Sequence, residues 1–399
     1  MNRELIKTIS DRRSLKVVAL LLLALVLAVL LVQTFHKAYR EGGYDFTSYL
    51  LSASALAHGE NPYQSDTPFP YIYPMFLALV LIPLSVIPYW LANLIWYAVN
   101  VASLLGSIVV VVRLSSNSLL TDWKGKFLTP VVLSLLLLLP VIQNNLLNGQ
   151  ANFLVLFLCV LTLKYYRESR VVPASICLAL ASAIKLVPLF LILFLVLRRE
   201  FRMFGLAAIL FVIFCLLPVI TLGGDILTIY GEYWHDFLFG KISTGTVGKP
   251  DQIYFTLSGF VSQIVPSISG WAWLKLISAL VVAATVSVID LLAVRRSGKA
   301  SGVWTFHLYL VAILMITPLS ETHHLAFLIP LLVLLVVRLI YDNQSPAGFH
   351  VATVAIFILL FYLGRALGGP FYFLALTVLF PAVMRVAMVA QLSQPAESV

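Results

Sequence analysis

Long apolar runs separated by short polar connections dominate the chain, and this pattern predicts helices that cross a membrane. The first run covers 17–35, and a polar stretch rich in Tyr, Gly, Pro and Asn then extends from His36 to about Pro70. Further apolar runs lie at about 73–112, 127–142, 150–163, 171–184, 187–198, 203–222, 271–294, 303–319, 324–341, 351–364 and 371–391. Because a membrane-crossing helix needs roughly 20 residues, the chain has room for about 11 to 13 crossings. We therefore predict an all-α polytopic membrane protein with about 12 transmembrane helices.

Several runs are shorter than a full crossing requires, which predicts broken helices around a cavity. Backbone ends inside a membrane are tolerated only where they are buried in protein or line a wet space. The run 73–112 is long enough for two helices and divides near Pro88, although the charge pattern favours an odd number of crossings there. Within the first polar stretch, 45–58 has helical spacing but is too polar to span, and Gly59 and Pro62 end it. We expect an interfacial helix on the outer surface.

Composition agrees with a membrane protein and excludes an ordinary soluble enzyme. Of 399 residues, 61% are apolar and 11% are charged, whereas soluble domains contain roughly 25% charged residues. A soluble domain is not evident, so 1–399 is interpreted as a single integral membrane domain. The segments 36–72 and 223–256 are its two large outer loops.

The net charge of +9 indicates membrane topology and no nucleic-acid partner, because basic residues cluster beside apolar runs. We assign five basic segments to the cytoplasm: 113–126, 164–170, 198–202, 295–301 and 338–342. The outer side then collects 36–72, 143–150, the turn at Lys185–Pro188, 223–256, 320–324 and 365–370. Arg12, Arg13 and Lys16 before the first run are also typical of a signal peptide. That run is long for one and no small-residue cleavage site follows, so we expect an uncleaved helix and a multi-pass protein of the cell membrane.

Polar residues on the expected outer side are the candidates for chemistry. Asp45 begins the interfacial helix, where a carboxylate either serves as a cap or acts as a general base at the mouth of a cavity. Lys185 stands alone between two apolar runs, where it either extends toward headgroups or binds a phosphate. Five amides crowd the turn between two short helices and either cap helix ends or bind substrate: Asn144, Asn145, Asn148, Gln150 and Asn152.

Two further groups complete the candidate set. Glu321, His323 and His324 lie at the outer end of a helix, and hydrogen bonding to substrate is favoured over a metal. Adjacent residues on a helix point about 100° apart, and the chain contains no Asp-x-Asp pair, so we expect no metal. No nucleotide fingerprint or phosphate-binding Gly-rich loop occurs, so no cofactor is expected. The remaining polar candidates are Glu60, Asn61 and Tyr63 in one outer loop, and Asp251 and Gln252 in another.

These pieces, taken in order, resemble glycosyltransferase family 87, polyprenyl-phosphate-sugar-dependent enzymes of the GT-C superfamily. The similar segments cover about 40 to 335 and are Asp45 with Tyr49, Ala53 and Ala57, Gly59-Glu60-Asn61-Pro62-Tyr63, Tyr71-Ile72-Tyr73-Pro74, Gly149-Gln150-Ala151-Asn152, Ala183-Ile184-Lys185-Leu186-Val187-Pro188, and His323-His324 with Pro330. The chain departs from the family at Asp251-Gln252-Ile253, where an Asn-Gln-Ser element is expected.

The resemblance implies a GT-C fold, a catalytic outer loop within 36–72 and a cavity that faces away from the cytoplasm. It implies Asp45 as the base, His323 or His324 as a second catalytic group, and Lys185 as the ligand of the donor phosphate. It implies substrate contacts from Glu60, Asn61, Tyr63, Gln150, Asn152, Asp251, Gln252 and Glu321. The expected reaction moves a sugar, mannose first, from a polyprenyl-phosphate donor to a lipid or glycan acceptor with inversion.

Two other functions are compatible with a polytopic chain of this kind. A transporter or flippase of a lipid-linked or polar solute also uses broken helices with polar groups. Its polar groups are expected at the midplane in two related halves, whereas here they gather toward one side. A scaffold subunit of an envelope-assembly complex is the third alternative, and it predicts that Asp45 and Lys185 are dispensable.

Overall fold

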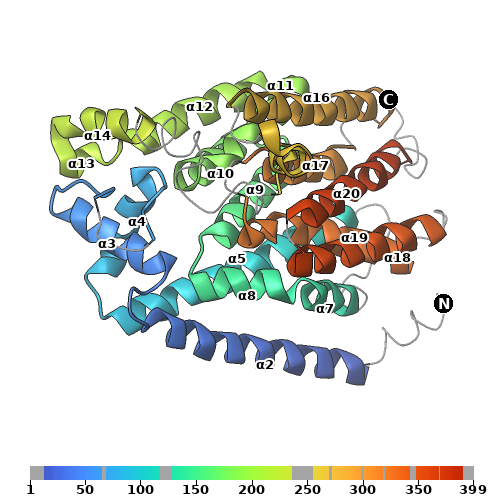
Figure 1. Ribbon diagram of the computed structural model, residues 1–399, viewed down its shortest axis with the longest axis horizontal. Coiled ribbons are helices and arrows are strands. Elements are labelled where there is room, and N and C mark those ends of the chain that lie inside the picture. Colours follow the sequence, from blue (N-terminus) through green and yellow to red (C-terminus); the bar gives the residue numbers. More distant parts are fainter. Residues whose placement is uncertain are drawn as a thin grey trace.

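The protein is all-helical in the parts of the chain that the computed structural model describes: 13–64, 69–116, 128–235, 255–268, 272–297, 301–317, 320–341, 347–367 and 369–389. No strand occurs in these ranges, which confirms the all-α prediction. The helices run roughly side by side (Figure 1), with α2 along one edge of the molecule and α12 and α16 along the opposite edge.

Up to residue 222, the described residues form eleven α-helices of very different lengths: α2 (Arg13–Ala38), α3 (Asp45–Ala57), α4 (Met75–Ser85), α5 (Tyr89–Ser116), α7 (Leu128–Leu137), α8 (Leu139–Asn148), α9 (Asn152–Arg167), α10 (Val171–Ile184), α11 (Leu191–Leu197), α12 (Phe201–Leu216) and α13 (Val219–Leu222). The C-terminal half continues with α14 (Ile226–Glu232), α15 (Leu257–Ile264), α16 (Ala272–Ser297), α17 (Gly302–Ile316), α18 (Ile329–Tyr341), α19 (Ala347–Leu367) and α20 (Gly369–Val389). Short 3-10 turns join several of them: η1 (Val187–Phe190), η2 (Gly223–Asp225), η5 (Pro266–Ile268) and η7 (Thr322–Leu328).

Four helical stretches among the described residues are long and apolar enough to cross a membrane: Val17–Ala38, Tyr89–Leu114, Phe201–His235 and Trp273–Arg296. The pair α7 and α8, bent by 66°, makes a fifth if it counts as one span. The remaining apolar helical segments have 10–17 residues, in agreement with the short runs of the sequence. The chain is therefore a multi-pass membrane protein, and the number of about 12 crossings stays a prediction.

The run 73–112 divides as predicted, and the lengths of its two helices account for the charge pattern. α4 has 11 residues and is about 16 Å long, roughly half the hydrocarbon thickness of a bilayer. α5 has 28 residues and is about 42 Å long, which exceeds that thickness. One full-length helix in this run fits the odd number of crossings that the basic loops favour.

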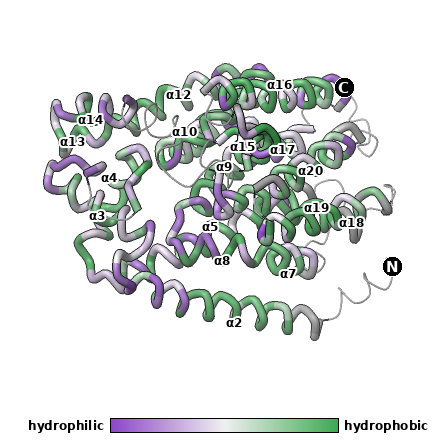
Figure 2. Tube along the Cα trace, viewed as in Figure 1, coloured by the Kyte–Doolittle hydropathy of each residue, from purple (hydrophilic) through white to green (hydrophobic). Residues whose placement is uncertain are grey.

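The core consists of helices that are apolar on every side. α9 packs against α5 and α10, and α17 packs against α16 and α20. Every residue of α17 from Gly302 to Met315 is buried, as expected for a helix without a polar face. By contrast, α2 exposes Leu21, Leu25 and Val32 on its outer side, a surface that suits contact with lipid. Figure 2 shows apolar residues along most of α2.

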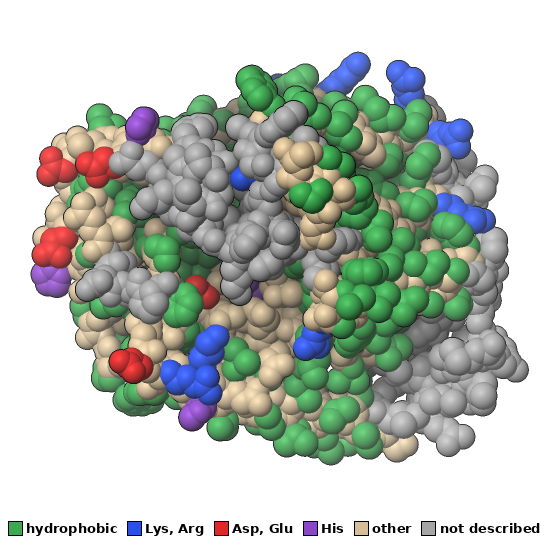
Figure 3. All heavy atoms as spheres, in the orientation of Figure 1, with side chains coloured by type: hydrophobic (Ala, Val, Ile, Leu, Met, Phe, Trp, Pro, Cys, Tyr) green, Lys and Arg blue, Asp and Glu red, His purple; other side chains and the backbone are tan. Residues whose placement is uncertain are grey.

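Acidic side chains gather at one end of the molecule. On the face drawn in Figure 3, acidic side chains lie at the end formed by α3, α13 and α14, and several Lys and Arg side chains line the opposite edge. The segments assigned to the outer side also meet through hydrogen bonds. Lys37 bonds Asn148, Gln150 bonds Asp45, and Asn145 bonds the carbonyl of His323. The first large loop, the amide turn and the segment 320–324 therefore lie at one end of the helices.

Arg198, in the basic segment 198–202 that the charge pattern assigns to the cytoplasm, has a buried side chain. Its guanidinium is 2.6 Å from Asp290 Oδ1 and donates to Ser301 Oγ and Thr305 Oγ1, at 2.9 and 2.8 Å. The side chain is 2% exposed, so it joins α11 to α16 and α17. A buried guanidinium is tolerated where a carboxylate and hydroxyl groups accept its hydrogen bonds. The position of Arg198 at a helix end gave no indication in the sequence that it pairs with Asp290.

Two other segments also differ from expectation. The loop predicted at 223–256 is helical at its start, through η2 and α14, and 236–254 lie outside the described residues. Asn144, Asn145 and Asn148 belong to α8 and not to a turn. Their amides donate to carbonyls within α8 or to neighbouring groups, so the helix continues to Gly149.

Candidate active site

Asp45 begins α3 at a sharp change of chain direction. Gly42 and Gly43 precede it with positive φ values of 80° and 65°, a conformation that glycine adopts without strain. The carboxylate occupies the first turn of the helix, where the helix dipole favours negative charge. Two buried aromatic neighbours, Tyr44 and Phe46, anchor this turn to α5: the Tyr44 hydroxyl bonds Asn93, and Phe46 stacks on Trp96. These contacts of Tyr44 and Phe46 therefore fix the Asp45 carboxylate at one end of the packed helices.

The carboxylate of Asp45 is held by Gln150. Gln150 Nε2 donates to Asp45 Oδ2 at 2.7 Å. On its other side, Gln150 Oε1 accepts from the hydroxyls of Tyr73 at 3.2 Å and Tyr49 at 3.5 Å. These two tyrosines also bond each other at 3.0 Å, so they fix which face of the amide points at Asp45.

The turn that carries Gln150 depends on Gly149. This residue ends α8 in the left-handed conformation, with φ +62°, and its carbonyl accepts from Trp96 Nε1 at 2.7 Å. A Cβ atom at this position would lie 2.6 Å from Phe46 Cβ and 2.6 Å from Tyr44 Cε2. Only glycine therefore allows α8 to approach the start of α3 this closely.

Burial and the neighbouring cations shift the pKa of the Asp45 carboxyl in opposite directions. Burial is the larger effect and raises the pKa of the carboxyl to about 6. The hydrogen bond from Gln150 and the charges of Lys37 and Lys185 lower it, and Glu321 raises it slightly. A carboxyl group with this pKa is ionised at neutral pH and accepts a proton readily, which is the requirement for a general base.

Lys185 lies at the break between α10 and η1. The backbone leaves the helix there, with φ −148° and ψ 126°, and the side chain is 6% exposed. Its Nζ donates to Asn152 Oδ1 at 2.8 Å, lies 2.8 Å from His324 Nε2 and sits 5.4 Å from the centroid of the Tyr73 ring. A buried cation at the C-terminus of a helix is placed to pair with an anion that enters the site.

The two histidines belong to η7, and only His324 contacts Lys185 directly. The backbone N–H of Glu321 donates to His324 Nδ1 at 3.0 Å, and the other ring nitrogen, Nε2, faces Lys185 Nζ at 2.8 Å. The rings of His323 and His324 are 4.2 Å apart, closer than neighbours on an α-helix are expected to lie. One hydrogen bond joins these two nitrogens, so one of them accepts from the other. Lys185 has three N–H donors in its charged form, and such a group can also bind a phosphate oxygen.

Two asparagines connect these donors to the rest of the site. Lys185 donates to Asn152, which donates to Asn145 Oδ1 at 2.9 Å. Asn145 Nδ2 in turn donates to the carbonyl of His323 at 2.7 Å. This chain of side chains joins α10, α9, α8 and η7, and it fixes the start of η7 beside Lys185.

The structure brings some of the predicted residues together and leaves others apart. Asp45, Gln150, Asn152, Lys185, His323 and His324 form one cluster, and Glu321 lies at its edge, with Oε2 3.7 Å from His323 Nδ1. Tyr63 packs against Tyr233 and donates to the Tyr73 carbonyl, and Asn61 contacts Glu232. Glu60 is exposed in the same loop. Asp251 and Gln252 lie outside the described residues.

Tyr49, Tyr73 and Lys37 were absent from the predicted site, and Asn145 was included only as one of the five amides between two short helices. Tyr49 and Tyr73 hold Gln150, Asn145 holds the start of η7, and Lys37 lies near Asp45. The two tyrosines occur in the family-like segments, which was the only signal for them in the sequence. Among the described residues, no group of three or more His, Cys, Asp or Glu side chains is arranged to hold a metal ion.

Comparison with known proteins found similar proteins in sequence and in structure. It is 27% identical over 329 residues to the polyprenol-phosphate-mannose-dependent α-(1-2)-phosphatidylinositol pentamannoside mannosyltransferase of Mycobacterium tuberculosis (strain CDC 1551 / Oshkosh), an alignment that covers 80% of this chain and 72% of that protein. Among solved structures, ArnT from Cupriavidus metallidurans in the apo state matches 94% of this chain and 77% of its own, with a TM-score of 0.43 and 14% identity. The same protein bound to undecaprenyl phosphate gives a TM-score of 0.41 and 14% identity, over 94% and 78% of the two chains.

A family model supplies the assignment. Residues 71–318 match the model of glycosyltransferase family 87, and this range is more than half of the chain. It contains Gln150, Asn152 and Lys185, whereas Asp45 and the two histidines lie outside it. The resemblance noted from the sequence is thereby confirmed, and the chain belongs to glycosyltransferase family 87.

Proposed function

We propose that this glycosyltransferase moves mannose from a polyprenyl-phosphate donor to a lipid or glycan acceptor on the outer side of the membrane, with inversion at the anomeric carbon. The observation that carries the proposal is the cluster in which a carboxylate held by Gln150 lies near a buried lysine paired with His324. The name of the mycobacterial relative supports the choice of donor and sugar.

The residues of the cluster divide into two roles. Asp45 is the general base, and Gln150 fixes the direction of its carboxylate. Lys185 and His324 bind the donor phosphate and stabilise the negative charge that it keeps after the sugar leaves. Asn145 and Asn152 are positioning residues, since they act through Lys185 and the backbone of η7.

The reaction is a single displacement. Asp45 takes the proton of an acceptor hydroxyl, and the hydroxyl oxygen forms a bond to the anomeric carbon. The bond between that carbon and the phosphate oxygen breaks, and its electron pair stays with the polyprenyl phosphate. Attack from the face opposite the phosphate inverts the configuration. Binding both substrates in the required orientation supplies a large part of the acceleration.

The meeting of the predicted outer segments and the charge pattern both support an outer-facing site. The outer loop 36–72, the amide turn after α8 and the start of η7 meet at one end of the helices. The basic segments 164–170 and 295–301 belong to the side that the charge pattern assigns to the cytoplasm. A donor held in the membrane by its polyprenyl chain reaches such a site laterally, without a soluble nucleotide-binding domain.

The test is sugar transfer by the purified protein from radiolabelled polyprenyl-phosphate mannose to a membrane lipid extract, with other polyprenyl-phosphate sugars in parallel. We expect Asp45→Asn to reduce transfer by about 10²- to 10⁴-fold, the usual contribution of a general base. Asp225→Asn is the matched control, because Asp225 is an exposed carboxylate in η2 outside the cluster; it should keep wild-type activity. We also expect transfer to persist in EDTA. Full activity of Asp45→Asn would overturn the mechanism, and no transfer from any donor by folded protein would favour a transporter.

A further inference from the structure

Tyr73 contacts both halves of the candidate active site. It lies in the segment just before α4, and only 6% of its surface is exposed. Its hydroxyl donates to Gln150 Oε1 at 3.2 Å, and Gln150 holds the carboxylate of Asp45. The centroid of its ring lies 5.4 Å from Lys185 Nζ, which is within the range of a cation–π contact. One side chain thus connects the carboxylate of the cluster with its lysine.

The hydrogen bonds around Tyr73 all point toward Asp45. A hydroxyl group donates one proton, so Tyr49 cannot donate to Tyr73 and to Gln150 at once. Its hydroxyl lies 3.0 Å from the Tyr73 oxygen and 3.5 Å from Gln150 Oε1, so the bond to Tyr73 is the stronger one. Tyr73 then donates its own proton to Gln150, and Gln150 donates to Asp45. Bonds arranged head to tail in this way strengthen one another.

This direction matches the ionised form of Asp45. The amide of Gln150 presents its NH2 group to Asp45 Oδ2 at 2.7 Å and its oxygen to the tyrosines. A rotated amide would present its oxygen to Asp45, and that oxygen accepts hydrogen bonds but donates none, so it would bond only to a protonated carboxyl group. The donor hydroxyl of Tyr73 therefore favours the amide orientation that stabilises a carboxylate, the form required of a general base.

The hydrogen bond from Gln150 acts on Asp45 together with groups from several elements. These groups are Lys37 on α2, Lys185 at the break after α10, Glu321 before η7, and the hydroxyls of Tyr44, Tyr49 and Tyr73. The bond from Gln150 and the two lysines lower the pKa of Asp45, whereas burial and Glu321 raise it. If the amide is no longer held toward Asp45, the carboxylate loses part of this stabilisation and its pKa rises above about 6.

The backbone around Tyr73 is held by contacts that do not involve its own hydroxyl. The carbonyl of Tyr73 accepts from the Tyr63 hydroxyl at 3.0 Å. In the same segment, the Tyr71 hydroxyl donates to the carbonyl of Pro74 at 2.7 Å. Loss of the Tyr73 hydroxyl should therefore leave the course of the chain before α4 unchanged.

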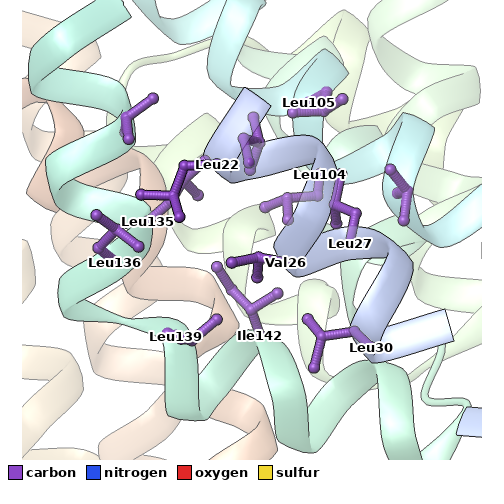
Figure 4. Close-up of a pocket in the computed structure, with 13 residues that line it drawn as sticks. Leu22, Val26, Leu27, Leu30, Leu104, Leu105, Leu135, Leu136, Leu139 and Ile142 are labelled. Carbon is purple, nitrogen blue, oxygen red and sulfur yellow. The ribbon is translucent and has the colours of Figure 1, made fainter. Parts of the chain in front are cut away.

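The helix that leads to Gln150 is held by apolar packing. α8 packs against α2, and Figure 4 shows Ile142 of α8 close to Val26 and its neighbours on α2. The residues that line this space between α2, α5, α7 and α8 are all apolar, so its packing does not depend on the hydrogen bonds of Tyr73. A change confined to the Tyr73 hydroxyl should therefore turn the Gln150 side chain without moving α8.

We propose that Tyr73 is a positioning residue that couples the two roles of the active site. Its hydroxyl holds the Gln150 amide in the orientation that keeps Asp45 ionised, and its ring places the ammonium group of Lys185 for the donor phosphate. The proposal rests on the proposed function for the roles of Asp45 and Lys185, and it adds the side chain that connects them.

The first test follows the protonation of Asp45 and requires no turnover. Infrared spectra of the full-length protein in nanodiscs are recorded from pH 5 to pH 8, and difference spectra against Asp45→Asn isolate the band of this carboxyl group. Tyr73→Phe should raise the pKa of Asp45 by about 0.5 to 1 pH unit, because part of a hydrogen bond to a charged group is lost. Tyr49→Phe, one bond further from the carboxylate, should raise this pKa less.

Tyr71→Phe is the matched control. Tyr71 is a buried tyrosine of the same segment, and its hydroxyl bonds two backbone groups, the carbonyl of Pro74 and the N–H of Ala78. Removing this hydroxyl should leave the pKa of Asp45 unchanged, whatever its effect on thermal stability. An unchanged pKa in Tyr73→Phe, or an equal shift in Tyr71→Phe, would overturn the role of the Tyr73 hydroxyl.

The second test separates the ring from the hydroxyl by steady-state transfer. Tyr73→Phe keeps the ring, so the KM for the polyprenyl-phosphate donor should stay within about twofold of the wild-type value. Tyr73→Leu removes the ring as well and should raise this KM by about 3- to 10-fold, as expected for the loss of a cation–π contact. Elution volume and thermal unfolding check that both variants are folded. An equal donor KM in the two variants would overturn the role of the ring.

The two tests distinguish this proposal from the proposed function. If the wild type transfers no sugar but Tyr73→Phe shifts the titration of Asp45, the proposed function fails and the role of the hydroxyl stands. If the wild type transfers sugar and Tyr73→Phe leaves the titration unchanged, the proposed function stands and the role of the hydroxyl fails.

Discussion

At the scale of single residues, the site consists of buried polar and charged side chains. Burial removes them from water at a cost in free energy, and their hydrogen bonds offset part of that cost. Asp45, Lys185 and His324 each lie in a low-dielectric part of the molecule, and each has a partner that fixes its direction. Low dielectric strengthens the attraction between such groups and an incoming charge. A phosphate or a developing oxyanion therefore interacts with them more strongly than with the same groups in water.

The first prediction at this scale concerns pH. Burial raises the pKa of Asp45 from 3.8 to about 6, and only the ionised carboxylate removes a proton. Transfer should therefore increase as pH rises through about 6. At pH 5, about one tenth of the carboxylate is ionised, so activity should be about tenfold below the plateau. The same shift implies that ionisation of Asp45 opposes folding, because the folded protein binds this proton more tightly than the unfolded chain does.

The measurement is kcat/KM for the acceptor between pH 5 and pH 8 at saturating donor. The residual activity of Asp45→Asn serves as the control and should show no inflection near 6. A flat profile for the wild type in this range would contradict the assignment of Asp45 as the base.

The second prediction concerns the donor phosphate. Lys185→Met removes the ammonium group and keeps most of the side-chain volume. Because hydrogen bonds to charged groups contribute about 1.5–3 kcal/mol, the KM for the polyprenyl-phosphate donor should rise about 10- to 100-fold. The KM for the acceptor should change much less. Titration with donor analogues gives the two constants, and an equal effect on both would mean that Lys185 supports the site as a whole.

At the scale of elements, the site depends on helix ends that meet. The end of α8, the start of α9, the break after α10 and the turn η7 each supply one or two groups, and a hydrogen-bonded chain through Asn145 and Asn152 joins them. Helix termini leave backbone groups unsatisfied, so side-chain amides gather there. The side-chain amides of Asn145 and Asn152 also fix the positions of α8, α9 and η7 relative to Lys185.

Gly149→Ala tests this arrangement. The substitution places a Cβ 2.6 Å from Phe46 Cβ in a backbone conformation with φ +62°, so α8 must move away from α3. We expect a loss of stability of about 1–3 kcal/mol and a larger proportional loss of transfer, because Gln150 moves with the turn. Gly205→Ala in α12 is the matched control, since no atom lies within 4 Å of the added Cβ. Thermal unfolding and transfer assays of both variants distinguish backbone and steric strain at Gly149 from the general effect of replacing a glycine by alanine.

At the scale of the whole molecule, two polar clusters hold the helices together at different ends. The active-site cluster joins α3, α8, α9 and η7, and the pair Arg198–Asp290 joins α11, α16 and α17. Tyr309 donates to Asp290 Oδ2 at 3.1 Å and completes the second cluster. In the apolar interior of a membrane protein, each pair restricts how the helices pack, because any other packing leaves a charge unpaired.

The prediction at this scale is that the two members of the pair depend on each other. Arg198→Leu leaves the buried carboxylate of Asp290 without its cation and should destabilise the fold by about 3–5 kcal/mol. The double variant Arg198→Leu with Asp290→Leu should recover most of that loss. Arg202→Gln, an exposed cation in the next helix, should have little effect. Thermal unfolding in detergent measures all three, and a double variant as unstable as the single one would show that the pair acts through more than charge balance.

The sequence determined the class of the protein, the helical segments and the identity of the main charged groups. Apolar runs set the helices because burial in lipid requires satisfied backbone groups, and the break near Pro88 and the short helix from Asp45 followed from local signals. Asp45, Lys185 and the histidines stood out because an ionisable residue among apolar runs is costly. Glycosyltransferase family 87 was recognisable from their order.

Tertiary structure alone decided which of these residues meet. The contacts of Asp45 with Gln150 and of Lys185 with His324 join positions 105 and 139 residues apart, and no local periodicity encodes such a distance. Packing also brings Tyr49 and Tyr73 to Gln150, and Asn145 to the carbonyl of His323. It places Arg198, which the sequence assigns to a basic segment beside an apolar run, in a buried ion pair with Asp290. Local sequence fixes helix formation through backbone hydrogen bonds, whereas the position of a side chain in a site depends on how whole helices pack.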